Sequence, residues 1–393
     1  MIWDFLRKEE TDVKQGKPRQ MLLYRLLAAV AAPVLRLLFR LRYEKQELTG
    51  PTLVICNHVT NYDPLLVGTC FRKHFMHFVA SEHLFRLGWV SAVIRYITDP
   101  IPRRKGTSGA DTAMACLRKL RGGSSVCLFA EGECTWDGVT APIVPSTGRL
   151  AKMSNATLLT CRLEGGYLTA PRWGKGLRPG KMALKVVGRY APEELKQLDG
   201  EQIEALIQRD IHYDTWESQK AEPMRFRSRR RAENLQTVLY LCPRCRRSGT
   251  LTGKGKMVSC TCGAKWEFTE LGSFLPAEPF EHIAQWDAWQ SRELGNRRDL
   301  VLCDNDVTVF RIEANHQQTV LEKGTLILEN GVLRCGRFSW ELANIDDLAL
   351  VMSRNLLMSV GSDYYQLKAP KGSSLRKYRT AWNAERANTN CEV

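Results

Sequence analysis

Two residues that could do acid–base chemistry stand close together in residues 57–63, NHVTNYD, directly after an apolar run. His58 and Asp63 are five residues apart. On a continuous helix they would point about 140° away from each other, so they meet only if a turn lies between them. A histidine held by a carboxylate at the carboxyl end of a strand is the arrangement expected of a general base. The spacing therefore predicts a turn after a buried strand, with His58 as the base.

Two further polar groups follow strand-like segments downstream. The stretch TDPIPRRKG carries Arg103 and Arg104, and the stretch VCLFAEGECTW carries Glu131 and Gly132 just past an apolar run. Open α/β sheets bind ligands outside the carboxyl ends of their strands. The base, the two cations and the acid–glycine turn are therefore candidates for one cleft.

An α/β architecture is expected to position these residues, because short apolar strands alternate with helical stretches from residue 53 to about 187. The expected strands cover residues 52–56, 77–80, 126–130, 157–163 and 181–187. The expected helices cover residues 64–71, 92–96, 107–120, 145–153 and 194–214. This alternation predicts a mixed sheet flanked by helices.

The order of these motifs resembles the glycerolipid acyltransferase family, which includes 1-acylglycerol-3-phosphate acyltransferases. The shared features are H-x4-D, an arginine segment and a strand ending in F-x-E-G, all behind an apolar N-terminal helix, over roughly residues 21–185. The resemblance implies that His58 removes the proton of an acceptor hydroxyl, which then attacks the thioester of acyl-CoA or of an acyl carrier protein. Asp63 would hold the imidazole in the right tautomer and stabilise its charged form.

The same resemblance assigns the substrate-binding residues. Arg103, ahead of Arg104, matches the family's phosphate-contacting arginine, and Glu131 and Gly132 match the core of its F-P-E-G-T-R motif. A lysolipid is the implied acceptor.

The sequence departs from the family motif at three positions. Ala130, Glu133 and Cys134 stand where the family has proline, threonine and arginine. Loss of that arginine removes a cation that would help to hold an acceptor phosphate, and Arg149 or Lys152 is the candidate to replace it. No second histidine is tied to Cys134 by a motif, so the sequence favours a thiol without a catalytic role.

The most apolar part of the chain is residues 21–43. Its longest uncharged run, residues 26–35, has ten residues, against the roughly twenty that span a bilayer. Arginines interrupt the pattern and Pro33 is expected to kink it. The segment predicts a helix that lies in the membrane interface; the alternative is an amphipathic helix packed on the protein's own core.

Charge and cysteine content bound the partners and the compartment. The net charge of +15 suits an anionic partner: a membrane surface, nucleic acid or an acidic carrier. Thirteen cysteines and a charged rather than apolar beginning predict a reducing, cytosolic compartment. We therefore expect a peripheral or monotopic protein at the cytoplasmic face of a membrane.

Four cysteines in the second half have metal-ligand spacing. Cys242 and Cys245 form a CxxC, and Cys260 and Cys262 form a CxC that follows a glycine-rich hairpin. Two close pairs of thiolates match a tetrahedral structural zinc site, which predicts a zinc ribbon. The basic run RFRSRRR, residues 225–231, precedes it and is expected to be a solvated linker or a contact for phosphate headgroups or an acidic carrier.

Residues 300–367 predict a separate β-rich module. Seven short β-rich runs follow one another, Asn330-Gly331 is the dipeptide of a type I′ hairpin turn, and a helix is expected over 373–386. The pattern resembles a pleckstrin-homology-like or GRAM-like barrel. The whole chain thus divides into an interfacial segment (1–45), an acyltransferase domain (46–220), a basic linker (221–240), a zinc ribbon (241–270) and a β-rich domain (271–393).

Three functional hypotheses follow. The first is a membrane-associated O-acyltransferase that converts a lysolipid, most simply 1-acylglycerol-3-phosphate to phosphatidic acid. The second is the same chemistry on an acceptor without the phosphate. The first is also compatible with a C-terminal half that acts as a lipid-sensing or docking module, with the ribbon as a spacer. The third, from another class, is a nucleic-acid-binding protein built on the ribbon and the basic run; no aromatic platform accompanies those basic residues, so no nucleic-acid partner is expected.

Overall fold

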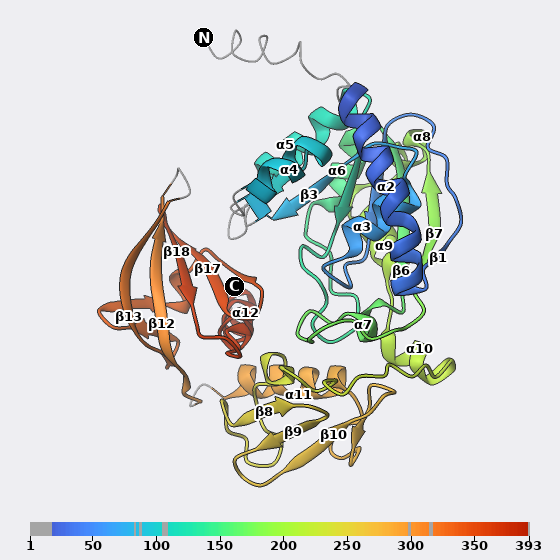
Figure 1. Ribbon diagram of the computed structural model, residues 1–393. Helices are drawn as coiled ribbons and strands as arrows, with labels where there is room; N and C mark the ends of the chain where they lie inside the picture. The colour runs from blue at the N-terminus through green and yellow to red at the C-terminus, as the bar shows by residue number, and fades with distance from the viewer. Residues whose placement is uncertain are drawn as a thin grey trace. The chain divides into compact units, whose positions relative to one another are not determined.

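The computed structural model describes residues 18–81, 84–85, 89–103, 109–297, 300–313 and 317–391. Arg104 and residues 1–17 of the predicted segment 1–45 lie outside these residues. The described chain forms two compact units (Figure 1). The first runs to Pro223, without Trp173–Gly176, and the second comprises Trp173–Gly176 and Met224 onward.

The first unit is built on a seven-stranded sheet in the order β1-β7-β6-β2-β5-β3-β4. The strands are β1 (Arg42–Tyr43), β2 (Thr52–Cys56), β3 (Met76–Ser81), β4 (Ile101–Arg103), β5 (Ser125–Phe129), β6 (Thr157–Glu164) and β7 (Ala183–Tyr190). The five strands from β6 to β4 in this order are parallel, whereas β7 runs antiparallel to β6. The predicted mixed sheet is confirmed, and the carboxyl ends of β2, β5, β3 and β4 share one edge.

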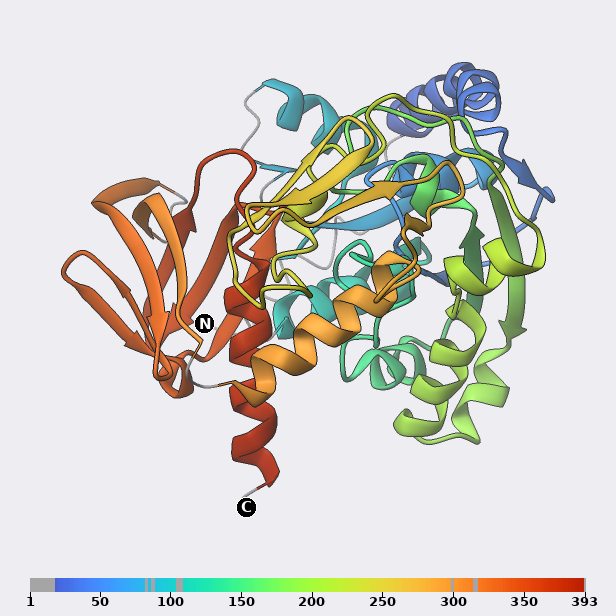
Figure 2. The same cartoon turned by 90° about the horizontal axis from the view of Figure 1, so that it is seen from below.

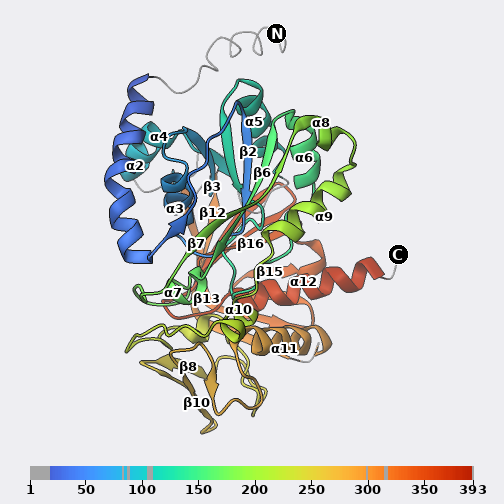
Figure 3. The same ribbon diagram turned by 90° about the vertical axis from the view of Figure 1, so that its right-hand side faces the viewer.

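Helices cover both faces of this sheet (Figure 3). They are α2 (Pro18–Phe39), α3 (Asp63–Cys70), α4 (Trp89–Thr98), α5 (Ala110–Arg121), α6 (Thr147–Ser154), α7 (Gly166–Thr169), α8 (Pro192–Lys196), α9 (Gly200–Ile211) and α10 (Thr215–Ala221). Helices α5, α6 and α9 pack one face into a continuous apolar core with β2 and β5, which includes Leu53, Leu117 and Ile207. Helices α2, α3 and α4 contact one another and lie on the other face.

One helical stretch differs from expectation. Residues 194–214 were predicted as one helix, but they form α8, a short break and α9. The break follows from Asp199, whose carboxylate accepts the backbone N–H of Gln202 while the Gln202 side chain accepts the N–H of Asp199. This reciprocal capping box begins a new helix at Gly200.

Helix α2 is two-faced. Tyr24, Ala32, Leu35 and Phe39 are buried, whereas seven large apolar side chains are exposed: Leu22, Leu26, Leu27, Val30, Val34, Leu37 and Leu38. The stretch Arg19–Phe39 is long and apolar enough to cross a membrane, but core helices and signal sequences share these two properties. Length and composition thus leave the expected interfacial orientation a prediction.

The second unit contains a four-stranded sheet in the order β11-β10-β9-β8. Its strands are β8 (Leu251–Lys254), β9 (Met257–Cys260), β10 (Lys265–Phe268) and β11 (Phe274–Leu275). Helix α11 (Ile283–Asn296), which the sequence analysis did not anticipate, places Trp286 against Trp266 and Phe274. These buried rings form the small core of this sheet.

The second unit also contains an antiparallel seven-stranded sheet, ordered β15-β14-β13-β12-β18-β17-β16. Its strands are β12 (Leu302–Ile312), β13 (Gln318–Glu329), β14 (Val332–Cys335), β15 (Phe338–Glu341), β16 (Asp347–Val351), β17 (Asn355–Val360) and β18 (Asp363–Lys368), and α12 (Arg376–Cys391) follows. The predicted turn is confirmed, since Asn330 and Gly331 have φ of 48° and 74°. The likeness to pleckstrin-homology or GRAM modules stays a prediction.

The segment 221–240 differs from the expected linker. Phe226, Ala232, Leu235, Val238 and Leu239 are buried, because every few residues an apolar side chain turns into the core of the second unit. The ribbon and the β-rich sheet also belong to one unit rather than to two.

Helices α11 and α12 lie side by side within this unit (Figure 2). The Arg376 guanidinium on α12 binds both carboxylate oxygens of Asp287 on α11. Gln290, one turn further along α11, donates to Asp287 and to the carbonyl of Val238, and accepts the backbone N–H of Tyr240. A hydrogen-bonded chain therefore links α12 through α11 to the backbone that leads into Cys242.

Gln290→Leu is expected to lower the free energy of unfolding of the second unit by roughly 3 kcal/mol, because it leaves the buried carbonyl of Val238 and the backbone N–H groups of Tyr240 and Leu241 without this partner. Chemical denaturation followed by tryptophan fluorescence measures the change. Gln285→Leu, at an exposed position of the same helix, is the control and should stay within about 1 kcal/mol of the parent chain. Equal stability of the two variants would contradict the proposed weight of this network.

Candidate active site

His58 and Asp63 meet across a tight turn between β2 and α3. The His58 Nδ1 lies 2.8 Å from Asp63 Oδ2, and Asp63 is fully buried at the first residue of α3. The same carboxylate accepts the backbone N–H groups of Val59 and Thr60 at 2.6 and 2.9 Å and the Thr60 hydroxyl at 2.7 Å. The turn expected between the two residues is therefore built around the carboxylate itself.

This contact fixes the protonation pattern of the imidazole. An ionised carboxylate only accepts hydrogen bonds, so in the neutral ring His58 Nδ1 carries the proton and Nε2 presents its lone pair. No in-plane partner of Nε2 is found among the residues that the structure describes, and the side chain is 18% exposed. Geometry thus suits His58 to accept a proton at Nε2 from a molecule that approaches the edge of the sheet.

The backbone around His58 is held from three sides. The side chain of Asn57 exchanges two hydrogen bonds with the backbone of Leu163 on β6. Glu131 Oε1 accepts the N–H of His58 at 2.6 Å, and the carbonyl of His58 accepts the N–H of Thr135 at 2.8 Å. The position of the base is therefore set by both neighbouring strands of β2.

Both faces of the imidazole are covered. The Phe129 ring stacks on it, with centroids 4.4 Å apart and planes inclined by 22°. Cys134 Sγ is 3.4 Å from Nδ1 and 3.4 Å from Nε2. Equal distances place the sulfur over the other face of the ring, because an in-plane atom so close to both nitrogens would overlap the carbon between them. The sulfur is not aligned with the Nε2 lone pair, so it neither blocks that lone pair nor passes it a proton.

The charge state of His58 reflects these contacts. Burial disfavours the charged imidazolium, but the Cys134 sulfur and the hydrogen-bonded Asp63 carboxylate outweigh burial, and the pKa of His58 is raised above its ordinary value. A raised pKa makes the neutral imidazole a stronger base. It also moves the pH at which the base becomes available upward.

Glu131 and Gly132, which were predicted to bind substrate, shape the loop after β5. The second carboxylate oxygen of Glu131 accepts the N–H of Ala141 at 2.7 Å, so both oxygens serve the backbone. Burial raises the pKa of Glu131 to about 7, against the opposing effect of these two N–H donors. Gly132 has φ of 74°, a left-handed conformation that glycine adopts without strain.

Arg103 ends β4 on the same sheet edge as His58. Three strand spacings separate β4 from β2, roughly 14 Å, and the guanidinium lies against Gly109 at the start of α5. Arg104 lies outside the described residues. The structure thus places Arg103 on the predicted edge but records no contact between it and His58.

Arg172 is a site residue that the sequence analysis missed. Its guanidinium donates to Glu133 Oε2 at 3.0 Å and to the carbonyl of Cys134 at 2.7 Å, and it stacks on the Trp136 ring at 3.7 Å. Arg172 therefore pins the loop that carries Cys134 over His58. No motif marks it, because it lies 38 residues beyond Cys134.

The two cations proposed to replace the missing motif arginine point elsewhere. Lys152 donates to the carbonyl of Leu198 at 2.6 Å, and the Arg149 side chain lies against Gly200 at the start of α9. Both are engaged on the α9 side of the sheet, so this expectation is not supported.

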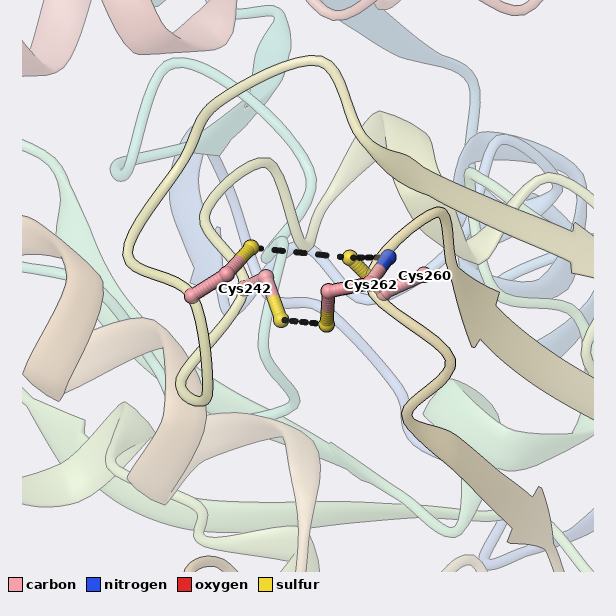
Figure 4. A group of neighbouring side chains, drawn as sticks. Cys242, Cys260 and Cys262 are labelled. Atoms are coloured by element: carbon pink, nitrogen blue, oxygen red, sulfur yellow. Dashed lines mark hydrogen bonds between the residues drawn. The ribbon is translucent and has the colours of Figure 1, made fainter.

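The four cysteines of the second unit form a separate cluster (Figure 4). Their sulfur atoms all lie within 4.8 Å of one another. Cys242 and Cys262 are 3.9 Å apart, and Cys245 and Cys260 are 3.7 Å apart. Zn–S bonds of about 2.3 Å in a tetrahedron require sulfur–sulfur distances near 3.8 Å, so the donor set and its spacing fit a zinc ion.

Part of the first unit matches a known protein family. Residues 40–164 match the family model described as Acyltransferase. The chain therefore contains an acyltransferase-type α/β domain, with a mixed sheet behind an apolar N-terminal helix. Among solved structures, the 1-acyl-sn-glycerophosphate acyltransferase PlsC from Thermotoga maritima is similar: it is 20% identical, the match covers 52% of this chain and 81% of that one, and the TM-score is 0.41.

Cys134→Ala is expected to move the acidic limb of the pH profile of kcat/KM for acyl transfer to lower pH. With His58 as the base, the neutral imidazole is the form that accepts the proton, so activity should rise with pH through the pKa of His58. Removal of the sulfur takes away one of the two groups that raise this pKa. The loss in kcat should stay well below the roughly hundredfold or greater loss that removal of a base brings.

Cys116→Ala removes another buried thiol of the first unit and is the control that should leave the limb in place. A limb that stays, or moves to higher pH, in Cys134→Ala would show that the sulfur does not tune the base.

Proposed function

We propose that this protein is a membrane-associated O-acyltransferase that transfers a fatty acyl group from an acyl thioester to the hydroxyl of a lysolipid. The observation that carries the proposal is the His58–Asp63 pair, with Nε2 open at the carboxyl edge of an acyltransferase-type sheet. The donor is acyl-CoA or an acyl carrier protein thioester. The simplest acceptor is 1-acylglycerol-3-phosphate, with phosphatidic acid as the product.

In the proposed reaction, His58 Nε2 takes the proton of the acceptor hydroxyl as its oxygen attacks the thioester carbonyl. The new C–O bond forms, the C–S bond breaks, and the leaving thiolate receives the proton from the imidazolium. Asp63 stabilises the positive ring between these two steps. A thioester is already activated, so the sequence of steps needs no acyl-enzyme, and the position of the Cys134 sulfur over the ring agrees with that.

Whether the acceptor headgroup carries a phosphate depends on which cationic side chains are available to bind it. Arg103 and Arg104 are the candidates to bind a phosphate, with Arg103 at the sheet edge. Cys134 stands where the resembling family has arginine, and Arg172 is already engaged by Glu133. A lysolipid without a phosphate is therefore the alternative acceptor.

Helix α2 supports a membrane location. Its seven exposed apolar side chains form a surface that an acyl-chain substrate or a bilayer interface would cover. All twelve cysteines whose side chains are described are free thiols, which agrees with a reducing compartment and hence with the cytoplasmic face.

We also propose that Cys242, Cys245, Cys260 and Cys262 hold a structural zinc ion. The sulfur spacing given above supports it, and four protein thiolates leave no position open for a substrate or water. Such an ion would hold together the two loops that flank β8 and β9.

His58→Ala is expected to lower the rate of acyl transfer by roughly a hundred- to ten-thousandfold, the usual contribution of a general base. The assay incubates the purified protein with labelled acyl thioesters and a panel of lysolipids, with and without a phosphate, and identifies the products by mass spectrometry. His212→Ala changes an exposed histidine of the same unit and should keep full activity. Full transfer by His58→Ala would refute the assignment.

Metal analysis of the purified chain is expected to give one zinc per molecule. Cys262→Ser should release it and lower the melting temperature of the second unit, because a structural zinc contributes folding free energy. Cys303→Ser, at an exposed thiol outside the cluster, is the control. A chain that melts at the same temperature with and without a chelator would contradict a structural ion.

A further inference from the structure

The positive charge of the chain is concentrated in one short stretch. Residues 225–268 contain eleven lysine and arginine residues and two glutamates, so this stretch holds a net +9 of the chain's +15. All of these cations except Arg231 are exposed. A surface of this kind generates a local potential that attracts anions.

The charges fall into two groups with different surroundings. Arg244, Arg246 and Arg247 lie in the loop of the cysteine cluster, where four thiolates on a divalent ion would carry negative charge, and Arg247 hydrogen-bonds Cys245. These arginines have a local counter-charge. The second group lies at the tip of the β8–β9 hairpin, away from the cysteines.

The hairpin tip gathers cations from two parts of the chain. Lys254 and Lys256 flank its turn, and the segment that carries Arg229 and Arg230 is fixed against it. The backbone N–H of Ala232 donates to the carbonyl of Gly255 at 2.8 Å, the N–H of Gly253 donates to the Gln236 side chain, and the N–H of Gly255 donates to Glu233.

This packing needs close backbone approach. A Cβ at Gly253 would lie 2.2 Å from the carbonyl oxygen of Ala232. The basic run is therefore held rigidly beside the hairpin lysines, where like charges repel. Lys256 has a partner in Glu267 at 3.5 Å, but no acidic side chain pairs with Arg229, Arg230 or Lys254 among the residues that the structure describes. A fold that holds three cations without ion-pair partners beside a fourth, at an exposed turn, is expected to do so at a functional surface.

We propose that the hairpin tip formed by Arg229, Arg230, Lys254 and Lys256 binds the anionic headgroups of a membrane surface. The inference rests on the proposed function, in which acceptor and product are lipids of that surface. It assigns to the second unit a part in holding the protein on membranes that contain anionic lipid.

The composition of the surface favours headgroups over the other anionic partners. An acidic carrier protein would require an apolar centre in the interface, and no large apolar side chain of residues 225–268 is exposed. A single-stranded nucleic acid would require aromatic rings to stack on, and Phe226, Trp266 and Phe268 are all buried. Separate long cations without apolar neighbours match the diffuse attraction of headgroups.

The test compares the full-length parent chain with R229Q/R230Q/K254Q in vesicle co-sedimentation. Neutral phosphatidylcholine vesicles and vesicles with a third of phosphatidylglycerol are used, each at low and high salt. Binding through the apolar surface of helix α2 should be similar for both vesicles, so the extra binding to anionic vesicles measures the contribution of the hairpin. Each charge near an anionic surface contributes about fivefold to binding, so the triple variant should lose roughly a hundredfold of the anionic-vesicle preference at low salt and little at high salt. Neutral-vesicle binding should be unchanged.

K323Q/R334Q/K368Q removes the same charge from exposed positions of the β-rich sheet and should keep the preference for anionic vesicles. Zinc content and melting temperature verify that each variant is folded. Acyl transfer to a short-chain acceptor dispersed in neutral detergent should be equal in the parent and in both variants. Absence of transfer in all three proteins would count against the acyltransferase assignment, independently of the vesicle result.

Three results would overturn the proposal. One is an unchanged anionic preference in R229Q/R230Q/K254Q, and another is an equal loss in the control variant. The third is the loss, in the hairpin variant alone, of binding to acyl carrier protein or to duplex DNA while vesicle binding persists.

Discussion

The acyltransferase-type unit depends on one buried carboxylate. Asp63 is fully inaccessible and receives four hydrogen bonds, from the His58 ring, two backbone amides and the Thr60 hydroxyl. A buried charge is tolerated only when it is paired and hydrogen-bonded. The turn between β2 and α3 provides those bonds, and it can do so only when His58 lies where its Nδ1 completes the set. Folding of the turn and orientation of the base are thus one event.

The loop after β5 supplies the other half of the arrangement. Its carboxylate at Glu131 ties the backbone of His58 to that of Ala141, and its sulfur at Cys134 covers the ring. Arg172 then holds the loop through a buried ion pair and a stacked tryptophan. Cys134 stands where the resembling family has arginine, and the guanidinium that contacts this loop, that of Arg172, is already engaged by Glu133 and Trp136. In the proposed function, proton transfer from the hydroxyl does not need this cation, and recognition of a phosphate would fall to Arg103 and Arg104.

The sequence predicts those parts of the fold that depend on local patterns. Apolar runs locate β2 and fall within the strands of the β-rich sheet, although the first two of its seven runs form the single strand β12 and the third spans β13 and β14. Asn330-Gly331 locates the hairpin between these two strands, because such a turn is decided by neighbours in the chain. The His58–Asp63 contact is also local, five residues long. The contacts of Cys134 with His58 and of Arg172 with Glu133 span 76 and 39 residues, so local spacing in the sequence does not predict them. The charges of the basic run dominate its local composition and predict a linker, but hydrogen bonds of Ala232, Glu233 and Gln236, which follow it, bind it to the hairpin.

The two candidate sites differ in whether they leave an atom open to another molecule, and the difference follows from what each site is proposed to do. A base that must accept a proton needs an open atom, and His58 keeps Nε2 open by using Nδ1, both ring faces and its backbone for support. A cluster of four thiolates uses every coordination position and leaves nothing open. Rigidity is the common requirement, but in the first unit it comes from a carboxylate that orders a turn, and in the second we propose that it comes from a zinc ion held by the four sulfur atoms. With the proposed zinc ion, the second unit is the one whose stability should depend on metal, whereas the proton transfer proposed for His58 uses side chains alone.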